Sequence, residues 1–171
     1  MGTDNKHAVD EWFNECYQCY ADSIFRFCLV KTSSRDIALD LSQEVFTKLW
    51  DHVRDGQKEV GNARALIFTI ARNSITDYYR KKKTDSLEPL LEIGIEPESD
   101  DNPSHNAEYA EALAAIKHLD EPYQEAVYLR YVEELPPRDI ARITGEKVNT
   151  VSIRITRGMK QLREQLEVGT T

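Results

Sequence analysis

The stretch "PPRDIARITGEKVNTVSIRITRGMKQLREQL", residues 136–166, holds the strongest fold signal in the chain. Two prolines precede a short apolar-periodic segment that stops at Gly145, and glycine is typical of helix ends. A second helix then follows from a cap at Asn149 and carries four cations before its first acid, Glu164. A short helix, a glycine-containing turn and a basic helix together predict a helix-turn-helix.

The basic helix has two different faces when its residues are placed at about 100° intervals. One face is apolar and predicts packing on the preceding helices: Val151, Ile155, Met159, Leu162 and Leu166. The opposite face is polar and basic apart from one isoleucine: Thr150, Ile153, Arg154, Arg157, Lys160 and Gln161. Such a helix fits the major groove of DNA, where Arg pairs with guanine and Lys or Thr binds phosphate. The alternative is a solvated charged face.

Composition indicates a soluble helical protein. The 171 residues are 40% hydrophobic and 30% charged, with a net charge of −8, and the few glycines and prolines favour helices. No apolar run approaches the roughly 18–20 residues that span a bilayer. The N-terminal stretch "MGTDNKHAVDEWF" lacks the basic start and apolar core of a signal peptide. We therefore expect a cytoplasmic protein without membrane insertion.

Charge is distributed in blocks along the chain. Residues 61–83 hold 6 basic and 1 acidic side chains, net +5, and residues 126–171 hold 8 and 6, net +2. Between them, residues 84–125 hold 1 basic and 12 acidic side chains, net −11. Pro89, Gly94, Pro97 and Pro103 interrupt any helix in this acidic block. We interpret residues 84–104 as an acidic flexible linker between two domains, with a long surface loop as the alternative.

The rest of the chain follows helical periodicity, so the expected fold is all-α. A first helix is predicted over Val9–Val30, a second after a cap at Ser33 or Ser34, and a third over 63–83. The second helix has an apolar face: Ile37, Leu41, Val45, Phe46 and Leu49. Helices are also expected at 105–118 and 121–134, ahead of the helix-turn-helix. This organisation gives domains at 1–83 and 105–171, joined by the 84–104 linker.

A second basic segment, "RNSITDYYRKKK", closes the third predicted helix at residues 72–83. It interleaves aromatic rings with cations, a composition that suits an opened or single nucleic-acid strand, because bases stack on rings while cations hold phosphates. The equally weighted alternative is a charged helix end with partly buried tyrosines.

Catalytic and metal-binding signatures are lacking. Cys16, Cys19 and Cys28 have no second ligand pair at zinc-site spacing, so we expect buried, reduced thiols. The four histidines are scattered, and neither a glycine-rich phosphate loop nor βαβ alternation is present. A tyrosine or serine DNA recombinase was the enzyme alternative, based on Tyr78, Tyr79 or Ser23. We expect no enzyme activity, no cofactor and no metal.

Several stretches resemble bacterial RNA polymerase sigma factors. The segment "YADSIFRFCLVKTSSRDIALDLSQEVFTKLW" is similar to their second region, including a core of Asp40, Leu41, Gln43, Glu44 and Phe46. "ALIFTIARNSITDYYRKKK" resembles the next part of that region, and residues 119–166 resemble the fourth region. The length and the two-domain plan resemble the small extracytoplasmic-function (ECF) group.

This resemblance implies a dissociable subunit of RNA polymerase that recognises promoters. It assigns docking on the polymerase clamp helices to Asp40, Gln43, Glu44 and Phe46. It assigns opening of the −10 element to residues 52–83, with Asn73, Asp77, Arg80 and Lys81 on the DNA. It assigns reading of the −35 element to helix 149–163, through Thr150, Arg154, Arg157 and Lys160.

The resemblance further implies a linker in the RNA-exit path of the polymerase and an anti-sigma factor as a partner. One departure is Pro136-Pro137, which replaces the usual Ser or Thr cap before the helix-turn-helix and removes a capping hydrogen bond. The alternative function is a helix-turn-helix repressor or response regulator that acts without polymerase docking. Such a protein needs a dimerisation or ligand domain, which residues 9–83 do not resemble.

Overall fold

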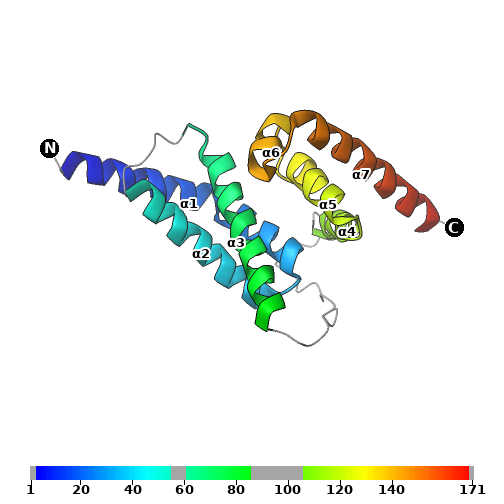
Figure 1. The fold of residues 1–171 in the computed structure, drawn as a ribbon, viewed down its shortest axis with the longest axis horizontal. Helices are drawn as coiled ribbons and strands as arrows, with labels where there is room; N and C mark the ends of the chain where they lie inside the picture. Colours follow the sequence, from blue (N-terminus) through cyan, green and yellow to red (C-terminus); the bar gives the residue numbers. More distant parts are fainter. Residues whose placement is uncertain (1–2, 55–60, 86–105, 170–171) are drawn as a thin grey trace. The chain divides into compact units, whose positions relative to one another are not determined.

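The chain folds into two groups of helices. The computed structural model describes residues 3–54, 61–85 and 106–169, and no strand occurs within these ranges (Figure 1). Contacts divide the chain into two compact units, Met1–Ile95 and Glu96–Thr171. The predicted all-α fold with two helical parts is confirmed. The predicted linker lies outside the described residues except at Thr84 and Asp85, which continue the third helix.

The described part of the first unit contains three helices: α1 (Thr3–Thr32), α2 (Arg35–Arg54) and α3 (Ala63–Asp85). α1 packs along α2, and both helices contact α3 (Figure 1). Their shared core is aliphatic and aromatic, including Ile24, Phe27, Val45, Leu49, Ile67 and Phe68. The predicted apolar face of α2 is buried apart from Ile37, which is half-buried. Burial of such side chains is the main source of stability for helices of this length.

Polar caps set where α2 and α3 begin. The Ser34 hydroxyl accepts a hydrogen bond from the Ile37 N–H at 3.5 Å, which confirms Ser34 as the cap of α2. Asn62 Oδ1 accepts from the Ala65 N–H at 2.9 Å and caps α3 in the same way. This second cap was not predicted from the sequence.

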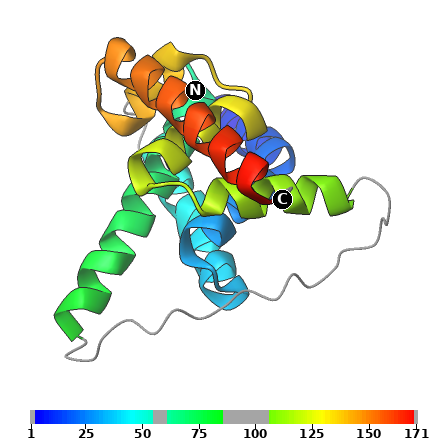
Figure 2. The same ribbon diagram turned by 90° about the vertical axis from the view of Figure 1, so that its right-hand side faces the viewer.

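The second unit contains α4 (Asn106–Lys117), α5 (Glu121–Val127), a π-helical turn η1 (Tyr128–Val132), α6 (Pro137–Thr144) and α7 (Val148–Gly169). α7 packs against α5 and α6. α4 crosses near the C-terminal part of α7 (Figure 2). There the Gln165 side-chain amide donates a hydrogen bond to the His118 carbonyl at 3.3 Å.

The helix predicted at 121–134 does not stay regular. After Val127 it widens into η1, where the Glu133 N–H bonds to the Tyr128 carbonyl at 3.2 Å. Glu134 then adopts a positive φ of 53°, and the Leu135 N–H reaches the Leu129 carbonyl at 2.9 Å. The wider turn lets Leu135 enter the core, where it is 2% exposed. Tyr128 donates to the buried Glu133 carboxylate at 3.1 Å.

The helix-turn-helix is formed by α6, the turn at Gly145 and α7. Gly145 has φ 72°, a left-handed conformation that favours glycine, and its N–H bonds to the Ala141 carbonyl. Pro136 precedes α6 and supplies no side-chain cap, as predicted. α7 begins at Val148, so the predicted cap at Asn149 was wrong. Its first backbone bond, from the Val151 N–H to the Lys147 carbonyl at 3.1 Å, leaves Asn149 inside the first turn.

Within the described ranges, no helix combines the length and the hydropathy that crossing a bilayer requires.

Candidate nucleic-acid interface

The two faces of α7 separate largely as the periodicity predicts. Val151 and Ile155 are buried, and Met159 and Leu162 are half-buried against the neighbouring helices. Leu166, which was expected on the packed face, is 51% exposed. The expectation that Leu166 packs against the preceding helices was therefore wrong.

The predicted −35 residues on the outward face of α7 differ in exposure and in ion pairing. Thr150 is half-buried and Arg157 is exposed. Lys160 is exposed and lies 3.9 Å from Glu164, a loose pair one turn along the helix. Among the described residues, Arg157 has no ion pair or hydrogen-bond partner. A guanidinium in this state keeps all its donors available for an anion or a base edge.

Arg154 differs from its neighbours on this face. Its Nη1 lies 2.5 Å from Oε2 of Glu146, in the turn that precedes α7. The side chains of Arg154 and Glu146 are only 29% and 24% exposed. Arg154 is therefore held in place before any nucleic acid arrives.

The basic end of α3 presents a second cationic surface. Asn73, Arg80 and Lys81 are exposed, and Asp77 is half-buried. Arg80 lies 3.2 Å from Asp77, one turn back on the same helix. Exposed pairs of this kind contribute little to stability, so the Arg80 guanidinium can exchange partners readily.

The tyrosines beside these cations also serve the fold. The Tyr79 hydroxyl donates a hydrogen bond to the Lys31 carbonyl, at the end of α1, at 2.6 Å. Tyr78 packs edge-on against Tyr79, with the ring centroids 5.3 Å apart. Lys82 lies 6.0 Å from the centre of the Tyr78 ring. Tyr78 is half-buried and its ring lies beside Lys82, whereas Tyr79 is 37% exposed and is tied to the fold through its hydroxyl.

The predicted polymerase-docking residues on α2 divide by burial. Asp40, Gln43 and Glu44 are exposed, which confirms that they lie on the outer side of the helix. Phe46 is 5% exposed, and its ring centroid lies 4.8 Å from that of Tyr17 on α1. Its place in the α1–α2 core means that any effect on docking would come through support of the helix.

A polar connection joins α2 to α3 beneath this face. The Lys48 ammonium lies 2.5 Å from the Glu44 carboxylate and donates to the Ser74 hydroxyl at 2.9 Å. Ser74 is buried on α3, next to Asn73 in the chain. Glu44 is therefore linked, through one lysine, to the helix that carries the basic surface.

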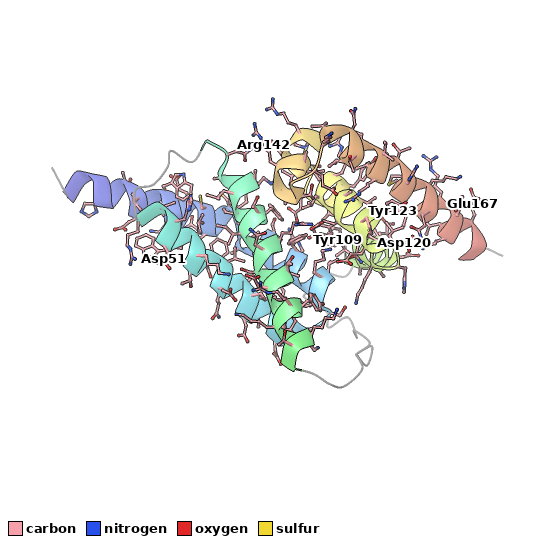
Figure 3. All side chains as sticks on the ribbon, in the orientation of Figure 1. Asp51, Tyr109, Asp120, Tyr123, Arg142 and Glu167 are labelled. Atoms are coloured by element: carbon pink, nitrogen blue, oxygen red, sulfur yellow. The ribbon has the colours of Figure 1, made fainter. Side chains whose placement is uncertain are left out.

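Three residues that support these surfaces were not predicted from the sequence: Lys48, Glu146 and Gly158. Gly158 carries a local signal, because a glycine within a helical pattern often marks close packing. A Cβ on Gly158 would lie 2.5 Å from Val127 Cγ2 and 3.1 Å from Tyr123 Cβ. Tyr123 lies on α5 beside α7 (Figure 3). The i,i+4 spacing of Glu44 and Lys48 is a local signal for their ion pair, whereas nothing local marks the contact of Lys48 with Ser74 or the role of Glu146.

The cysteines are free thiols in two environments. Cys16 and Cys28 are buried as expected, but Cys19 is exposed because it faces away from the α1–α2 contact. Burial raises the pKa of the Cys16 thiol to about 11, and Cys19 and Glu15 act in the same direction. Within the described part of the chain, no group of three or more His, Cys, Asp or Glu side chains could hold a metal ion.

Comparison with known proteins matches both units. Sigma-70 region 2 matches residues 16–84, and sigma-70 region 4 matches residues 109–162. The ECF RNA polymerase sigma factor SigM of Bacillus subtilis is 30% identical over 132 residues, covering 76% of this chain and 80% of SigM. The chain belongs to the ECF family of RNA polymerase sigma factors.

Other relatives agree with this assignment. The sigma factor SigV of Bacillus subtilis is 28% identical, with 88% of this chain and 89% of SigV covered. In the complex of RpoE with the anti-sigma factor NepR from Bartonella quintana, the matched chain is 24% identical, with a TM-score of 0.72 and coverage of 91% and 97%. CnrH in complex with the cytosolic domain of CnrY is 18% identical, with a TM-score of 0.70 and coverage of 96% and 95%. These two structures share the fold.

As an ECF sigma factor, the protein directs promoter-specific initiation of transcription. Region 2 corresponds to α1–α3, and region 4 corresponds to α4–α7. Sigma factors are initiation factors and not enzymes. A repressor or response regulator is not favoured, because the first unit matches region 2 and not a dimerisation or ligand-binding domain.

Proposed function

We propose that the two units of this ECF sigma factor divide the promoter between them. α7 reads the −35 element as a duplex, through Thr150, Arg154, Arg157 and Lys160. Residues 52–83 open the −10 element, with Asn73, Asp77, Arg80 and Lys81 on the DNA. The observation that carries this division is the pair of exposed cationic surfaces, one on each unit, of different composition.

The two surfaces suit different forms of DNA. The outward face of α7 offers guanidinium and hydroxyl groups on a helix backed by an apolar core, as needed for major-groove reading. The basic end of α3 places the Tyr78 ring among cations, which suits unpaired bases. The proposal keeps domains at 1–83 and 105–171 with the acidic linker 84–104 between them, in the RNA-exit path of the polymerase, except that Thr84 and Asp85 belong to α3.

Core RNA polymerase is the first partner that this proposal requires. Asp40, Gln43 and Glu44 form an exposed polar face on α2, supported by Phe46 beneath it. We assign this face to the clamp helices of the largest polymerase subunit. The protein works in the cytoplasm, without enzyme activity or a cofactor of its own.

An anti-sigma factor is the second partner. RpoE, which shares this fold, was solved in complex with the anti-sigma factor NepR, and CnrH, which also shares it, was solved with the cytosolic domain of CnrY. An inhibitor of this chain would act by covering the α2 face or either cationic surface.

Transcription on two templates tests the division. One promoter template is fully duplex, and the other carries a pre-melted −10 bubble; both are transcribed by core polymerase with each variant. Arg80→Ala should lose activity on the duplex and regain it on the bubble, because strand opening is no longer needed. Arg157→Ala should stay impaired on both. Equal rescue of the two variants would show that the division is wrong.

A further inference from the structure

Glu146 occupies a fixed position at the entrance to α7. It directly follows Gly145, whose left-handed backbone turns the chain. The Glu146 N–H also bonds to the Ala141 carbonyl at 3.1 Å, which fastens the turn to α6. The carboxylate therefore starts from a constrained backbone.

Arg154 reaches this carboxylate from within α7. Helical side chains lean toward the N-terminus of their helix, so Arg154 extends back toward the turn, where its Nη1 lies 2.5 Å from Glu146 Oε2. In helix-turn-helix proteins the N-terminal residues of the second helix approach the base edges. Glu146 thus holds the guanidinium at the end of α7 where bases would be read.

This pair differs from an ordinary surface ion pair on the same helix. Lys160 and Glu164 are 78% and 63% exposed and 3.9 Å apart, so they gain little from each other. Arg154 and Glu146 are each less than one-third exposed, and their contact is a short, charge-assisted hydrogen bond. Only one guanidinium nitrogen is used in this bond, and a guanidinium has five N–H donors.

We propose that Glu146 is a positioning residue for base recognition by Arg154. It fixes the rotamer of Arg154 before DNA binds, so that the remaining donors meet a guanine edge at one −35 position with less loss of side-chain freedom. Its negative charge also offsets Arg154 and reduces attraction to phosphates in general. Glu146 thereby favours selectivity over affinity. This inference rests on the proposed −35 role of Arg154.

The test measures base preference at every −35 position. Holoenzyme assembled with each variant selects from a promoter library with a randomised −35 element. Arg154→Ala should lose discrimination on the order of tenfold at one or two adjacent positions. Glu146→Ala should lose discrimination several-fold at those same positions while binding non-promoter DNA more tightly. The double variant should be no worse than Arg154→Ala, because Glu146 acts through Arg154.

Two further variants separate positioning from charge. Glu146→Gln keeps an oxygen that accepts from Arg154, so it should retain more of the preference than Glu146→Ala. Glu164→Ala removes the same charge from α7 without touching Arg154, so it should change affinity for all sequences alike. Thermal melting of each variant confirms that the second unit remains folded.

Three results would overturn the inference. In the first, Glu146→Ala keeps the full preference at the Arg154 position, so Glu146 only screens charge. In the second, the lost preference falls at a different position, so Glu146 contacts a base itself. In the third, Arg154→Ala changes no preference, and the proposed −35 role of Arg154 then fails as well. The first two outcomes leave that role intact, so the two failures are distinguishable.

Discussion

At the scale of single residues, Arg157 and Lys160 lie one turn apart on the outward face of α7, and both are exposed. Their chemistry differs, because a guanidinium can bond a guanine edge with two donors while an ammonium acts as a point charge. Arg157→Ala should cost about 1–3 kcal/mol of promoter binding and relax preference at one or two −35 positions. Lys160→Ala should weaken binding to DNA of every sequence by a similar factor. Binding of holoenzyme to promoters with different −35 sequences checks both predictions. If Arg157→Ala lowered the affinity for every −35 sequence equally, base reading by Arg157 would be contradicted.

The cysteines allow a second test at this scale. Burial raises the pKa of the Cys28 thiol to about 12, and that of the Cys16 thiol is raised to about 11, so both stay protonated at neutral pH. The thiolate is the reactive form, and Cys19 is the exposed thiol of the three. Native protein treated with iodoacetamide should therefore be alkylated at Cys19, with Cys16 and Cys28 modified only after denaturation. Peptide mass spectrometry reads this directly, and rapid native labelling of Cys28 would contradict the packing of α1.

At the scale of the helix, α2 separates its packing face from its exposed polar face. Replacing Asp40 and Gln43 together with Ala should weaken polymerase binding without unfolding the first unit, because both side chains face outward. Glu44 is left intact in this variant, since it also holds Lys48 against Ser74. Affinity for core polymerase is the measurement, with thermal melting beside it. A large fall in melting temperature would make these residues structural.

The contact between α5 and α7 depends on one glycine. Gly158→Ala should destabilise the second unit, because the new methyl would meet the buried Val127 at 2.5 Å. Overpacking lowers the free energy of unfolding by about 1–3 kcal/mol, whereas alanine raises it by about 1 kcal/mol through its higher helix propensity. The free energy of unfolding should therefore fall by about 1 kcal/mol.

The control for this variant is Gly61→Ala, where an added Cβ meets nothing within 4 Å. Thermal melting should show a loss for Gly158→Ala alone. Equal stability of both variants would mean that α5 and α7 can separate without cost.

At the scale of the whole molecule, charge opposes binding to free DNA. The chain is net −8, and its acidic block of net −11 separates the two basic regions along the sequence. Non-specific affinity comes from counterion release and grows with the number of phosphates neutralised. The isolated protein should therefore bind promoter DNA weakly at physiological salt, and core polymerase should raise that affinity greatly. Fluorescence anisotropy over a salt series measures this; tight specific binding by the isolated chain would contradict a polymerase-dependent subunit.

The sequence by itself determined the helices, the helix-turn-helix and the family. These features depend on local signals: the apolar period of α2 and α7, the serine before α2, and the glycine at position 145. Each acts within a turn or two of the chain, so its effect can be inferred without knowledge of the fold. The exposed face of α2 and the cations of α7 followed from the same periodicity.

The tertiary structure alone decided which side chains are partners. Lys48 meets Ser74 across 26 positions, and Tyr79 meets Lys31 across 48. Arg154 meets Glu146 across eight positions, from within α7 back to the turn that precedes it. The π-helical turn at Tyr128–Val132 likewise precedes a residue of the core, Leu135. Such contacts require the helices to be placed relative to one another to within a fraction of an ångström. That placement is set by all the buried side chains together and not by any local pattern.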